Sequence, residues 1–449
     1  MNLPASELFP NRSRRQRIWL IALPIIGGMV SQNILNLVDA AMVGSLGDAA
    51  LAAAGMGSFV NWLCFAAILG LASAVQAMAS RRLGEGQTSE VAKPLNAGLL
   101  LALLIGMPAA ALMIGLAEPI LAVLLNDPEV LALAIPYLQI RLLGMSGVGM
   151  NFAFRGFWSA VERTRFYLIS LLVMHALNIF LNWVLIFGNL GAPAMGVSGA
   201  ATATTLAIYI GTLMHLGFGL LHARHWGFMR TLPSLARFRT LLAIALPAST
   251  QSLFFSGGMV ALFWVIGQIG TAELAAAHVL MTLVLAGLLP SMAFGLAAAS
   301  LVGQSLGREQ PHDAWRWAWQ VTQLATGVAI VMGTVVLLFH RPILGLFLHD
   351  PDTLSLAVLP LMLAAIGMMI DATGTVLMNA HHGAGDTRRI MLVSVTLQWG
   401  CFLPLAWLLG PGSGGGLLAV WLAWAGYRLL HTAAMITLWQ RGAWASARA

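Results

Sequence analysis

The chain has few charged residues and few cysteines for its length. Of its 449 residues, 9% are charged and two are cysteines, whereas 59% are hydrophobic. Both cysteines, Cys64 and Cys401, lie in apolar stretches, where thiols behave as small hydrophobic groups, so neither a disulfide framework nor a paired-cysteine metal site is indicated. A soluble core cannot hide so much apolar surface. The composition therefore indicates a polytopic membrane protein.

Several catalytic sequence patterns are also missing. The chain contains no H-E-x-x-H, no Walker A and no nucleophile-elbow pattern. These patterns carry zinc proteolysis, nucleotide binding and serine hydrolysis. We therefore expect no enzyme activity, no ATP-driven step within this chain, no metal site and no cofactor beyond a coupling ion.

Apolar stretches of roughly 20 residues, the length that crosses a bilayer as a helix, recur along the chain. They lack strand-like alternation, and within lipid only helices or closed barrels satisfy the backbone. We predict twelve transmembrane helices, at residues 17–43, 49–79, 95–117, 130–154, 166–188, 196–221, 240–267, 274–305, 316–339, 353–379, 390–410 and 416–439.

Basic residues cluster beside alternate loops. Of the 23 lysines and arginines, all but three flank loops on one side; the exceptions are Arg141 and Arg428, within predicted spans, and Arg341, on the opposite side. The positive-inside rule then places both termini in the cytoplasm of a protein in the plasma membrane, or in the inner membrane of a Gram-negative cell. The net charge of +7 reflects this topology rather than nucleic-acid binding.

The two halves of the chain repeat at an offset of 223 residues. Six helices per half is an even number, so both halves begin on the same side of the membrane and form a parallel repeat. The paired segments include ALP at 22–24 and 245–247, Asp127-Pro128 and Asp350-Pro351, and Thr164-Arg165 and Thr387-Arg388.

The repeat predicts the domain organisation. We expect an N-terminal six-helix lobe at residues 1–221, a basic cytoplasmic linker at 222–239 and a C-terminal six-helix lobe at 240–449. Transporters built from such repeats hold substrate near the membrane midplane between the repeats. The fold class is an all-α polytopic membrane protein with two parallel six-helix repeats.

Asp39 lies inside the first predicted span. A carboxylate at bilayer depth is costly and usually lines a water-filled path or relays protons, although it can also be paired for structural reasons. Gln32, Asn36 and Asp39 follow i, i+4, i+7 spacing and so share one helix face. Pro24, on the same predicted helix, can kink it and change the surroundings of Asp39, but helix packing explains a proline there equally well.

Two further spans of the first half carry polar groups at helical spacing. His175, Asn178 and Asn182 follow i, i+3, i+7 in the fifth span, and the sixth carries Thr202, Thr205 and Tyr209. These groups can hydrogen-bond a carboxylate or offer oxygens to a small cation, although such groups also commonly join membrane helices. We predict Asn178 and Asn182 beside Asp39, with Gln32, Asn36, His175, Thr202 and Tyr209 as candidate substrate-cleft residues.

The second half carries a different acid. Asp371 lies in the tenth span, where the repeat partner is Val148, and the repeat partner of Asp39 is Leu262. Asp371 is either a second coupling group or simply paired with a basic or amide neighbour. The candidate cleft residues of this half are Gln251 and His278.

Four features together resemble the multidrug and toxic-compound extrusion (MATE) family of secondary transporters, over essentially the whole chain. They are ALP and NLVDAAMVGSLG within 22–47, LNIFLNWVLIFG and GAPAMGVSGAATAT within 177–204, DATGTVLMNAHHGAGDTRR at 371–389, and the repeated halves. The resemblance implies two six-helix lobes in a V-shaped arrangement. It also implies export of organic cations or other amphiphilic compounds in exchange for H⁺ or Na⁺.

The resemblance also implies residue roles in the first half. Asp39 matches the family's first-helix carboxylate, which is assigned to proton or cation coupling, and Pro24 matches a proline whose bend is tied to its protonation. Asn178 matches an asparagine beside that carboxylate. Thr202 lies where a threonine contributes in some members. Asn182 stands where many relatives have a second acid.

In the second half, Asp371 matches an acid of the Na⁺-coupled branch of the family. The carboxylate that accompanies it there on the seventh helix is missing, because residues 240–266 contain no acid and Ser256 or its neighbour stands nearby. Since both companion acids are absent, we favour H⁺ over Na⁺ as the coupling ion.

We therefore expect a monomeric cation-coupled antiporter for small amphiphilic or cationic compounds that works in a lipid bilayer by alternating access. Two alternatives stay open. One is a flippase for a lipid-linked precursor or polysaccharide. The other, from a different class, is an intramembrane aspartyl protease, since GAGD at 383–386 imitates its G-x-G-D pattern and Asp371 could be the second acid.

Overall fold

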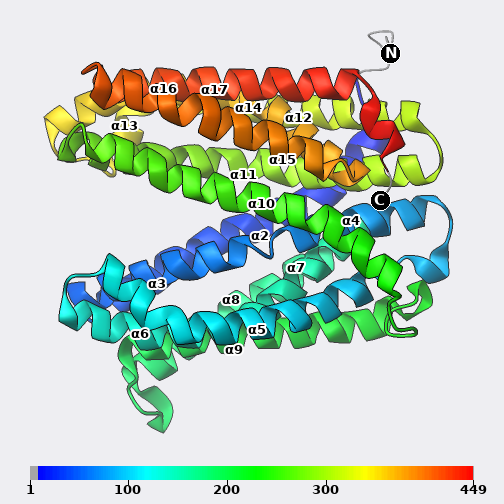
Figure 1. Cartoon of the computed structure of the whole chain (residues 1–449), viewed down its shortest axis with the longest axis horizontal. Helices are drawn as coiled ribbons and strands as arrows, with labels where there is room; N and C mark the ends of the chain where they lie inside the picture. The colour runs from blue at the N-terminus through cyan, green and yellow to red at the C-terminus, as the bar shows by residue number, and fades with distance from the viewer. Residues whose placement is uncertain (1–8, 448–449) are drawn as a thin grey trace. The chain divides into compact units, whose positions relative to one another are not determined.

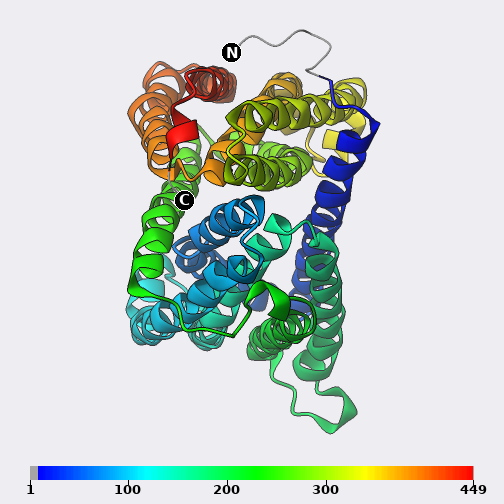
Figure 2. The same ribbon diagram turned by 90° about the vertical axis from the view of Figure 1, so that its right-hand side faces the viewer.

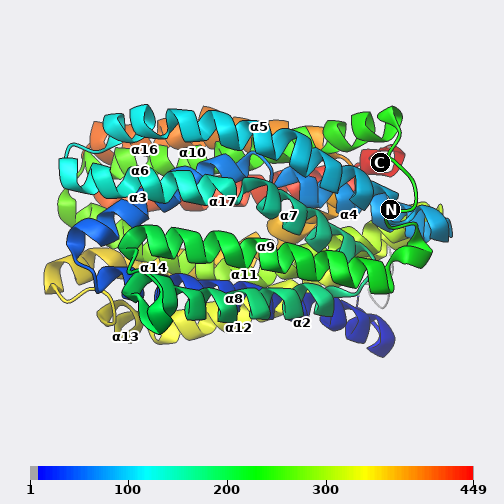
Figure 3. The ribbon, with the colours of Figure 1, turned by 90° about the horizontal axis from the view of Figure 1, so that it is seen from below.

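A computed structural model describes residues 9–447, and all regular secondary structure in that range is helical (Figure 1). The contacts divide the chain into two compact units, which we describe separately. Unit 1 contains the residues up to Ala22 together with Thr250–Ala449, and unit 2 is Leu23–Ser249. Within each unit, helices from distant parts of the sequence run side by side (Figures 2 and 3).

Within residues 9–447, twelve long helical stretches occur at the positions that the apolar runs predict. They are α2 (Arg12–Gly44), α3 (Asp48–Ala66) with α4 (Gly70–Gly84), α5 (Lys93–Leu124), α6 (Pro128–Leu143) with α7 (Met145–Ala160), α8 (Thr164–Phe187), α9 (Gly196–His222), α10 (Leu235–Gly267), α11 (Thr271–Gly307), α12 (Pro311–Leu338), α14 (Pro351–Ala384), Thr387–Gly412, which begins with α15 (Thr387–Val395), and α17 (Gly416–Gln440). A short helix, α13 (His340–Gly345), connects α12 to α14.

Most of these stretches are long and apolar enough to cross a membrane. Among the described residues ten meet that test, or eleven if α6 and α7, which meet at a 45° bend, count as one span. The remaining stretch, α17, is 25 residues long. It carries Trp421, Trp424, Arg428 and His431, which lower its hydropathy without shortening it.

The repeat is visible in how corresponding helices begin. Asp127 caps α6 by accepting the backbone N–H of Glu129 at 2.8 Å, and its repeat partner Asp350 caps α14 by accepting that of Thr353 at 2.9 Å. A proline follows each aspartate, where its missing N–H costs no helical hydrogen bond. These two acids are therefore helix caps, as expected for acids at helix ends.

The borders of the units differ from those of the predicted lobes. The first turns of α2 belong to unit 1, because Arg14 pairs with Asp313 and lies over the Trp317 ring at 4.1 Å. The first half of α10 belongs to unit 2, where Ser249 Oγ accepts the backbone N–H of Gly70 at 3.1 Å. Each of these two helices therefore takes part in both units.

The predicted linker at 222–239 is docked onto unit 2. The backbone N–H of Ala92 donates to Trp226 at 2.9 Å, and the Asn96 side chain donates to the carbonyl of Gly227 at 3.0 Å. Phe228 is fully buried. Helix α10 begins within the last residues of this segment.

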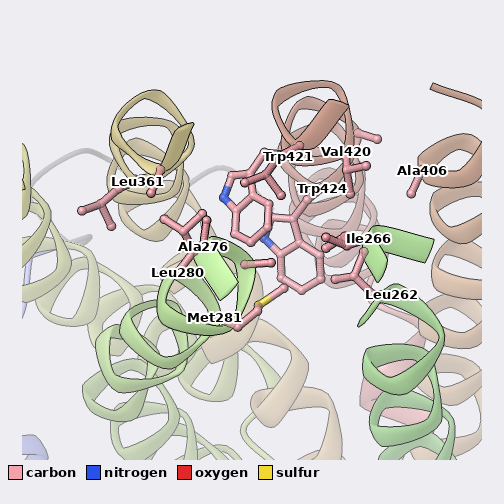
Figure 4. Packing of buried hydrophobic residues seen from close by; sticks show 14 of the residues in the cluster. Leu262, Ile266, Ala276, Leu280, Met281, Leu361, Ala406, Val420, Trp421 and Trp424 are labelled. Atoms are coloured by element: carbon pink, nitrogen blue, oxygen red, sulfur yellow. The ribbon is translucent and has the colours of Figure 1, made fainter. Parts of the chain in front are cut away.

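A large hydrophobic cluster lies in unit 1 and includes residues of α10, α11, α13, α14, α17 and the Thr387–Gly412 stretch (Figure 4). Leu262, the repeat partner of Asp39, is fully buried in it, together with Ile266 and Leu280. The rings of Trp421 and Trp424 extend from α17 into the same cluster. The position that carries an acid in one half thus has an apolar packing role in the other.

Candidate functional site

The polar side chains predicted around Asp39 do meet in unit 2, at the contact of α2 with α8. Asp39 is half-buried on α2, whereas Asn178 and Asn182 on α8 are 1% and 0% exposed. The i, i+4 spacing of the two asparagines puts both on the face of α8 that meets Asp39.

Asn182 connects Asp39 to the interior of unit 2. Its Nδ2 donates to Asp39 Oδ1 at 2.6 Å and to Asn178 Oδ1 at 3.0 Å. Asn178 Nδ2 in turn donates to Thr204 Oγ1 at 2.9 Å. Neutral amides therefore hold the Asp39 carboxylate, and none of the ion pairs among the described residues includes it.

One acceptor in this series of hydrogen bonds receives no donor among the described residues. Asn182 Oδ1 is buried and has no hydrogen-bond partner among the described residues. An unpaired buried acceptor is costly and needs an explanation. Because the Nδ2 of the same amide faces Asp39, Asn182 Oδ1 points away from that carboxylate and into the interior of unit 2.

Arg141 on α6 is the cation that acts on Asp39 from a distance. Its charge influences Asp39 electrostatically, while its own Nε has no hydrogen-bond partner in the described residues. Arg141 influences the site without neutralising Asp39 by direct contact.

A second polar chain includes His175. Ser31 Oγ lies 2.7 Å from His175 Nδ1, and His175 Nε2 lies 3.1 Å from Gln32 Oε1. Because an amide oxygen only accepts, Nε2 donates and Nδ1 accepts from Ser31. Gln32 Nε2 then donates to Asn36 Oδ1 at 3.0 Å. This chain follows the face of α2 that also carries Asp39.

Two predicted cleft residues lie outside these chains. Thr202 Oγ1 donates to the carbonyl of Ser198 in its own helix at 2.8 Å. Tyr209 donates to the carbonyl of Leu143 at 2.6 Å and lies 3.0 Å from Ser146 Oγ, so it joins α9 to the α6–α7 segment. Both act as contacts within or between helices in this structure.

Sequence reasoning missed Thr204 and Ser31. Thr204, two residues from the predicted cleft residue Thr202 and on a different face of α9, is the threonine that accepts from Asn178. Ser31 directly precedes Gln32, and helical periodicity alone gave no reason to select it. Pro24 lies inside α2, two residues after Ala22, where the contacts of this helix change from unit 1 to unit 2.

Asp371 has a different environment in unit 1. It is buried on α14 and forms an ion pair with Arg428 of α17. Arg428 also lies over the rings of Tyr427 and Trp424, at 5.6 and 6.0 Å. Pairing with a basic neighbour, one of the two roles expected for Asp371, is therefore present.

The other predicted residues of this half lie apart from Asp371. Gln251 Oε1 accepts from His382 Nε2 at 3.1 Å, and its Nε2 donates to Ser394 Oγ at 3.3 Å. His278 is exposed, and its ring centre lies 6.1 Å from that of Phe263. No hydrogen bond or ion pair in the described residues joins Gln251 or His278 to Asp371. His382 and Ser394 were not predicted.

The arrangement does not suit an aspartyl protease. Asp386, the acid of the G-x-G-D imitation, follows the end of α14 and lies 3.3 Å from His381 Nδ1. Asp371 is 13 residues before that helix end, which corresponds to about 20 Å along the helix axis. Two acids so far apart cannot share a catalytic water. Among the described residues no group of three or more His, Cys, Asp or Glu could hold a metal ion.

Comparison with known proteins gives a match over most of the chain. The family model MatE matches residues 24–184 and again residues 247–408. The two matches begin 223 residues apart, which is the offset of the internal repeat. The family model therefore matches each half separately.

Several curated bacterial proteins align with nearly the whole chain. The probable multidrug resistance protein NorM of Bradyrhizobium diazoefficiens is 30% identical over 416 residues, covering 90% of this chain and 88% of that protein. The corresponding protein of Brucella suis is 28% identical, with 96% and 94% covered. The multidrug resistance protein PmpM of Pseudomonas aeruginosa is 26% identical, with 91% and 86% covered.

Solved structures share the fold at low sequence identity. A multidrug resistance MATE family transporter of the MOP superfamily, in an outward-facing conformation, superposes with a TM-score of 0.88 at 19% identity, covering 98% of both chains. A MOP superfamily transporter from Pyrococcus furiosus, described as having a binding pocket of reversed polarity, gives a TM-score of 0.87 at 19% identity with 98% coverage of both chains. This likeness supports the all-helical two-repeat fold.

Proposed function

Because the chain belongs to the MatE family of multidrug and toxic-compound extrusion transporters, we propose that it exports cationic or amphiphilic compounds in exchange for protons, with Asp39 as the group that serves both ligands. Family membership makes the chain a multi-pass membrane transporter and not an enzyme. The coupling ion, the antiport step and the substrate class are the proposal.

The state of the Asp39 carboxylate carries this proposal. It is half-buried and hydrogen-bonded by the Asn182 amide, with no cation in direct contact among the described residues. A negative charge at membrane depth that no cation neutralises attracts a proton or an organic cation. Asp371, which Arg428 already neutralises, offers no comparable charge.

Exchange follows from competition at one carboxylate. A cationic substrate needs the ionised form of Asp39, and a proton that binds there removes the charge. Protonation from outside therefore releases the substrate, and loss of the proton to the cytoplasm restores the site. Asn182 favours the ionised form, because its Nδ2 donates to the carboxylate and is held in place by a second hydrogen bond to Asn178 Oδ1.

Pro24 belongs to this mechanism as the helix-bending residue of α2. It lies inside the helix that carries Asp39, and proline allows a bend by removing one backbone hydrogen bond. A change of charge on Asp39 alters which shape of α2 is favoured. This is how we connect proton binding to alternating access.

Protons are favoured over sodium by the composition of the site. A small hard cation is held by several oxygen ligands, and its affinity rises with the number of charged ligands. Asn182 is neutral where a second acid could stand, and Asp371 is paired with Arg428. Asp39 therefore has no second acid beside it, and the charge of Asp371 is neutralised. We further propose a monomer without cofactors in the plasma membrane, or inner membrane of a Gram-negative cell, with both termini in the cytoplasm.

The proposal is tested by reconstitution into liposomes with ethidium as the cationic probe. Efflux is measured under a proton gradient alone, a sodium gradient alone, and neither gradient. We expect efflux with the proton gradient only. Efflux driven by the sodium gradient alone would contradict the proposal that protons are the coupling ion. A lack of efflux under every gradient would contradict the transport of organic cations.

A further inference from the structure

Arg141 of α6 carries a positive charge that no carboxylate contacts. Its side chain is half-buried, and none of the ion pairs among the described residues includes it. Its buried Nε also lacks a hydrogen-bond partner in that part of the chain. A guanidinium inside a membrane protein is costly, because water no longer solvates its charge. The position of this charge therefore needs an explanation other than an ion pair.

Arg141 and Asp39 are placed alike relative to a buried apolar cluster of unit 2. The cluster includes one residue from each of the helices α2, α6 and α8, namely Val43, Tyr137 and Ile186. Four residues away along each helix, which is about 6 Å, a polar side chain follows. In the same order of helices, these polar side chains are Asp39, Arg141 and Asn182.

Helix α9 shows that these polar side chains lie on the same side of the cluster. The turn of α9 that follows its own cluster residues carries Thr204 and Thr205. Thr204 Oγ1 accepts from Asn178 at 2.9 Å, and Thr205 Oγ1 donates to the carbonyl of Ile140, the residue before Arg141, at 3.0 Å. One turn of α9 therefore contacts both the amides that hold the carboxylate and the turn of α6 that carries the guanidinium.

Arg141 is the nearby charge that acts on Asp39. Along the surrounding helices, the nearest other titratable groups are His175 of α8, Tyr137 of α6, Tyr209 of α9 and Asp48 at the start of α3. The first three form hydrogen bonds with serine, glutamine or backbone groups, and Asp48 is exposed. Residues 23–44 of α2 contain no charge besides Asp39. The charge of Arg141, in contrast, acts electrostatically on the Asp39 carboxylate.

The repeat shows that the two charges occur together. The residues 223 positions after Asp39 and Arg141 are Leu262 and Ala364, and both are buried in unit 1. Unit 1 thus has neither charge at these positions, and the acid and arginine that it does contain are in direct contact. In unit 2 the arginine is kept apart from the carboxylate.

A separated cation resolves a conflict at a carboxylate inside a membrane protein. Burial favours the protonated form of a carboxylate, and one that does not release its proton cannot attract a cationic substrate. A cation in direct contact favours the ionised form but also neutralises the charge that attracts the substrate. A cation at a distance favours the ionised form and leaves the carboxylate without a contacting partner.

We propose that Arg141 is a positioning residue that acts through Asp39: its charge holds the empty carboxylate in the ionised form and so sets the pH range in which the transporter exchanges its proton for substrate. The proposal rests on the proposed function, in which Asp39 binds the proton and the cationic substrate in turn. It assigns Arg141 no contact with either ligand.

The proposal predicts a shift in the pH dependence of substrate binding. Binding of ethidium to the full-length detergent-purified protein is measured by fluorescence over a series of pH values, without any gradient. In the wild type, binding should weaken as the pH falls through the value at which Asp39 takes up a proton. In Arg141→Gln the ionised carboxylate loses its neighbouring cation, so this midpoint should rise by roughly one pH unit. An unchanged or lower midpoint overturns the proposal.

Two further substitutions separate the charge of Arg141 from its side-chain structure. Arg141→Lys keeps the positive charge, so its midpoint should stay close to that of the wild type. Arg141→Met removes the charge without adding an amide, so it should show the same rise as Arg141→Gln, and it takes the place of that variant if the glutamine prevents folding. If the lysine variant shifts as far as the neutral variants, the charge is not the cause and the proposal is wrong.

Arg155→Gln is the matched control. Arg155 of α7 also has a buried Nε without a hydrogen-bond partner among the described residues, and its guanidinium lies 4.7 Å from the centre of the Phe152 ring. Its charge does not contribute to the electrostatics of Asp39. The midpoint for ethidium binding should therefore be unchanged. A rise equal to that of Arg141→Gln would mean that any buried arginine of this unit has the effect, which contradicts a specific role for Arg141.

Thermal unfolding and Asp39→Asn complete the test. A purely structural role for Arg141 predicts a lower unfolding temperature with an unchanged midpoint, which overturns the proposal. In Asp39→Asn the pH dependence of binding should be lost, and adding Arg141→Gln should change nothing further. If Asp39→Asn keeps the pH dependence of the wild type, the proposed function is contradicted. If that dependence is lost there but Arg141→Gln leaves the midpoint in place, only the role of Arg141 is contradicted.

Discussion

Asp39 and Asp371 are both acids inside predicted membrane spans, but their partners differ in charge. Asp39 in unit 2 accepts a hydrogen bond from the neutral Asn182, whereas Asp371 in unit 1 is paired with Arg428. A carboxylate held by amides keeps its charge available, and one held by a guanidinium does not. Membrane depth alone therefore does not make an acid a coupling group; the charge of its partner decides.

The repeat explains why the two acids are independent. Leu262 occupies the position of Asp39 in the second half and is buried in the hydrophobic cluster of unit 1. Val148 occupies the position of Asp371 in the first half and packs against an apolar cluster of unit 2. An apolar residue packs at the corresponding position of the other half in both cases, so the helical framework requires neither acid.

The largest expected effect is that of Asp39→Asn. The amide has a similar size but cannot exchange a proton, so proton-driven ethidium efflux from liposomes should fall by roughly tenfold or more. Asp39→Glu, which keeps the carboxyl group, is the control and should retain part of the activity. Full efflux in Asp39→Asn would contradict the proposal that Asp39, unlike Asp371, is the proton-coupling group.

The next effect concerns stability in unit 1. Asp371→Asn leaves the Arg428 charge without its partner, which should lower the free energy of unfolding by about 3–5 kcal/mol. The double variant Asp371→Asn, Arg428→Gln removes both charges and should recover most of that loss. Thermal unfolding in detergent measures both. A single variant as stable as wild type would mean that the pair is not a buried ion pair in solution.

A change at Asn182 should have a smaller effect, which is to create a sodium site beside Asp39 in unit 2. Asn182→Asp places a second carboxylate beside Asp39, and two carboxylates with the Asn178 oxygen form a hard oxygen set for a small cation. We expect sodium-driven efflux to appear that is undetectable in the wild type. The control is Asn182→Leu, which removes the amide without adding an acid and should give no sodium response.

The smallest effects should come from the two helix caps that the halves share. Asp127→Ala should lower the free energy of unfolding of unit 2 by about 1 kcal/mol, because the cap satisfies backbone N–H groups of α6. Asp350→Ala should act in the same direction in unit 1. Efflux at neutral pH should hardly change in either variant, and a large loss would give these acids a role beyond capping.

The Asp350 cap also predicts a pH dependence. Hydrogen bonds from the hydroxyl and backbone N–H of Thr353 hold the pKa of Asp350 below its usual value of 3.8. A carboxylate with a lowered pKa in the folded state stabilises the fold above pH 3.8, and this contribution is lost as the pH falls through the folded-state pKa. The stability difference between wild type and Asp350→Ala should therefore shrink below that pH.

Much of the fold was predictable because membrane helices leave a strong signal. Length and hydropathy located the twelve helical stretches of the described residues, of which ten or eleven meet the test for a membrane span, and the 223-residue offset anticipated the two matches of the family model. Helical spacing also placed Asn178 and Asn182 on one face of α8, and that face does meet Asp39. These inferences depend only on periodicity along one helix, which the sequence contains in full.

Contacts between helices were harder to predict. Thr204 rather than Thr202 meets Asn178, since the rotation of α9 about its axis decides which threonine faces α8. Tyr209 bonds to Leu143 for the same reason. The start of α2 joins unit 1 because Arg14 finds Asp313 there, although the two residues are far apart in the sequence.

The sequence by itself determined that this is a duplicated helical membrane protein with one unmatched acid in each half. That follows from composition, hydropathy and the repeat, which are properties of the chain alone. Only the tertiary structure decided that Asp39 is held by an amide and Asp371 by Arg428, since both pairings join helices distant in sequence. The charge of a partner on another helix is set by how the helices pack, and it is that charge which separates the two acids.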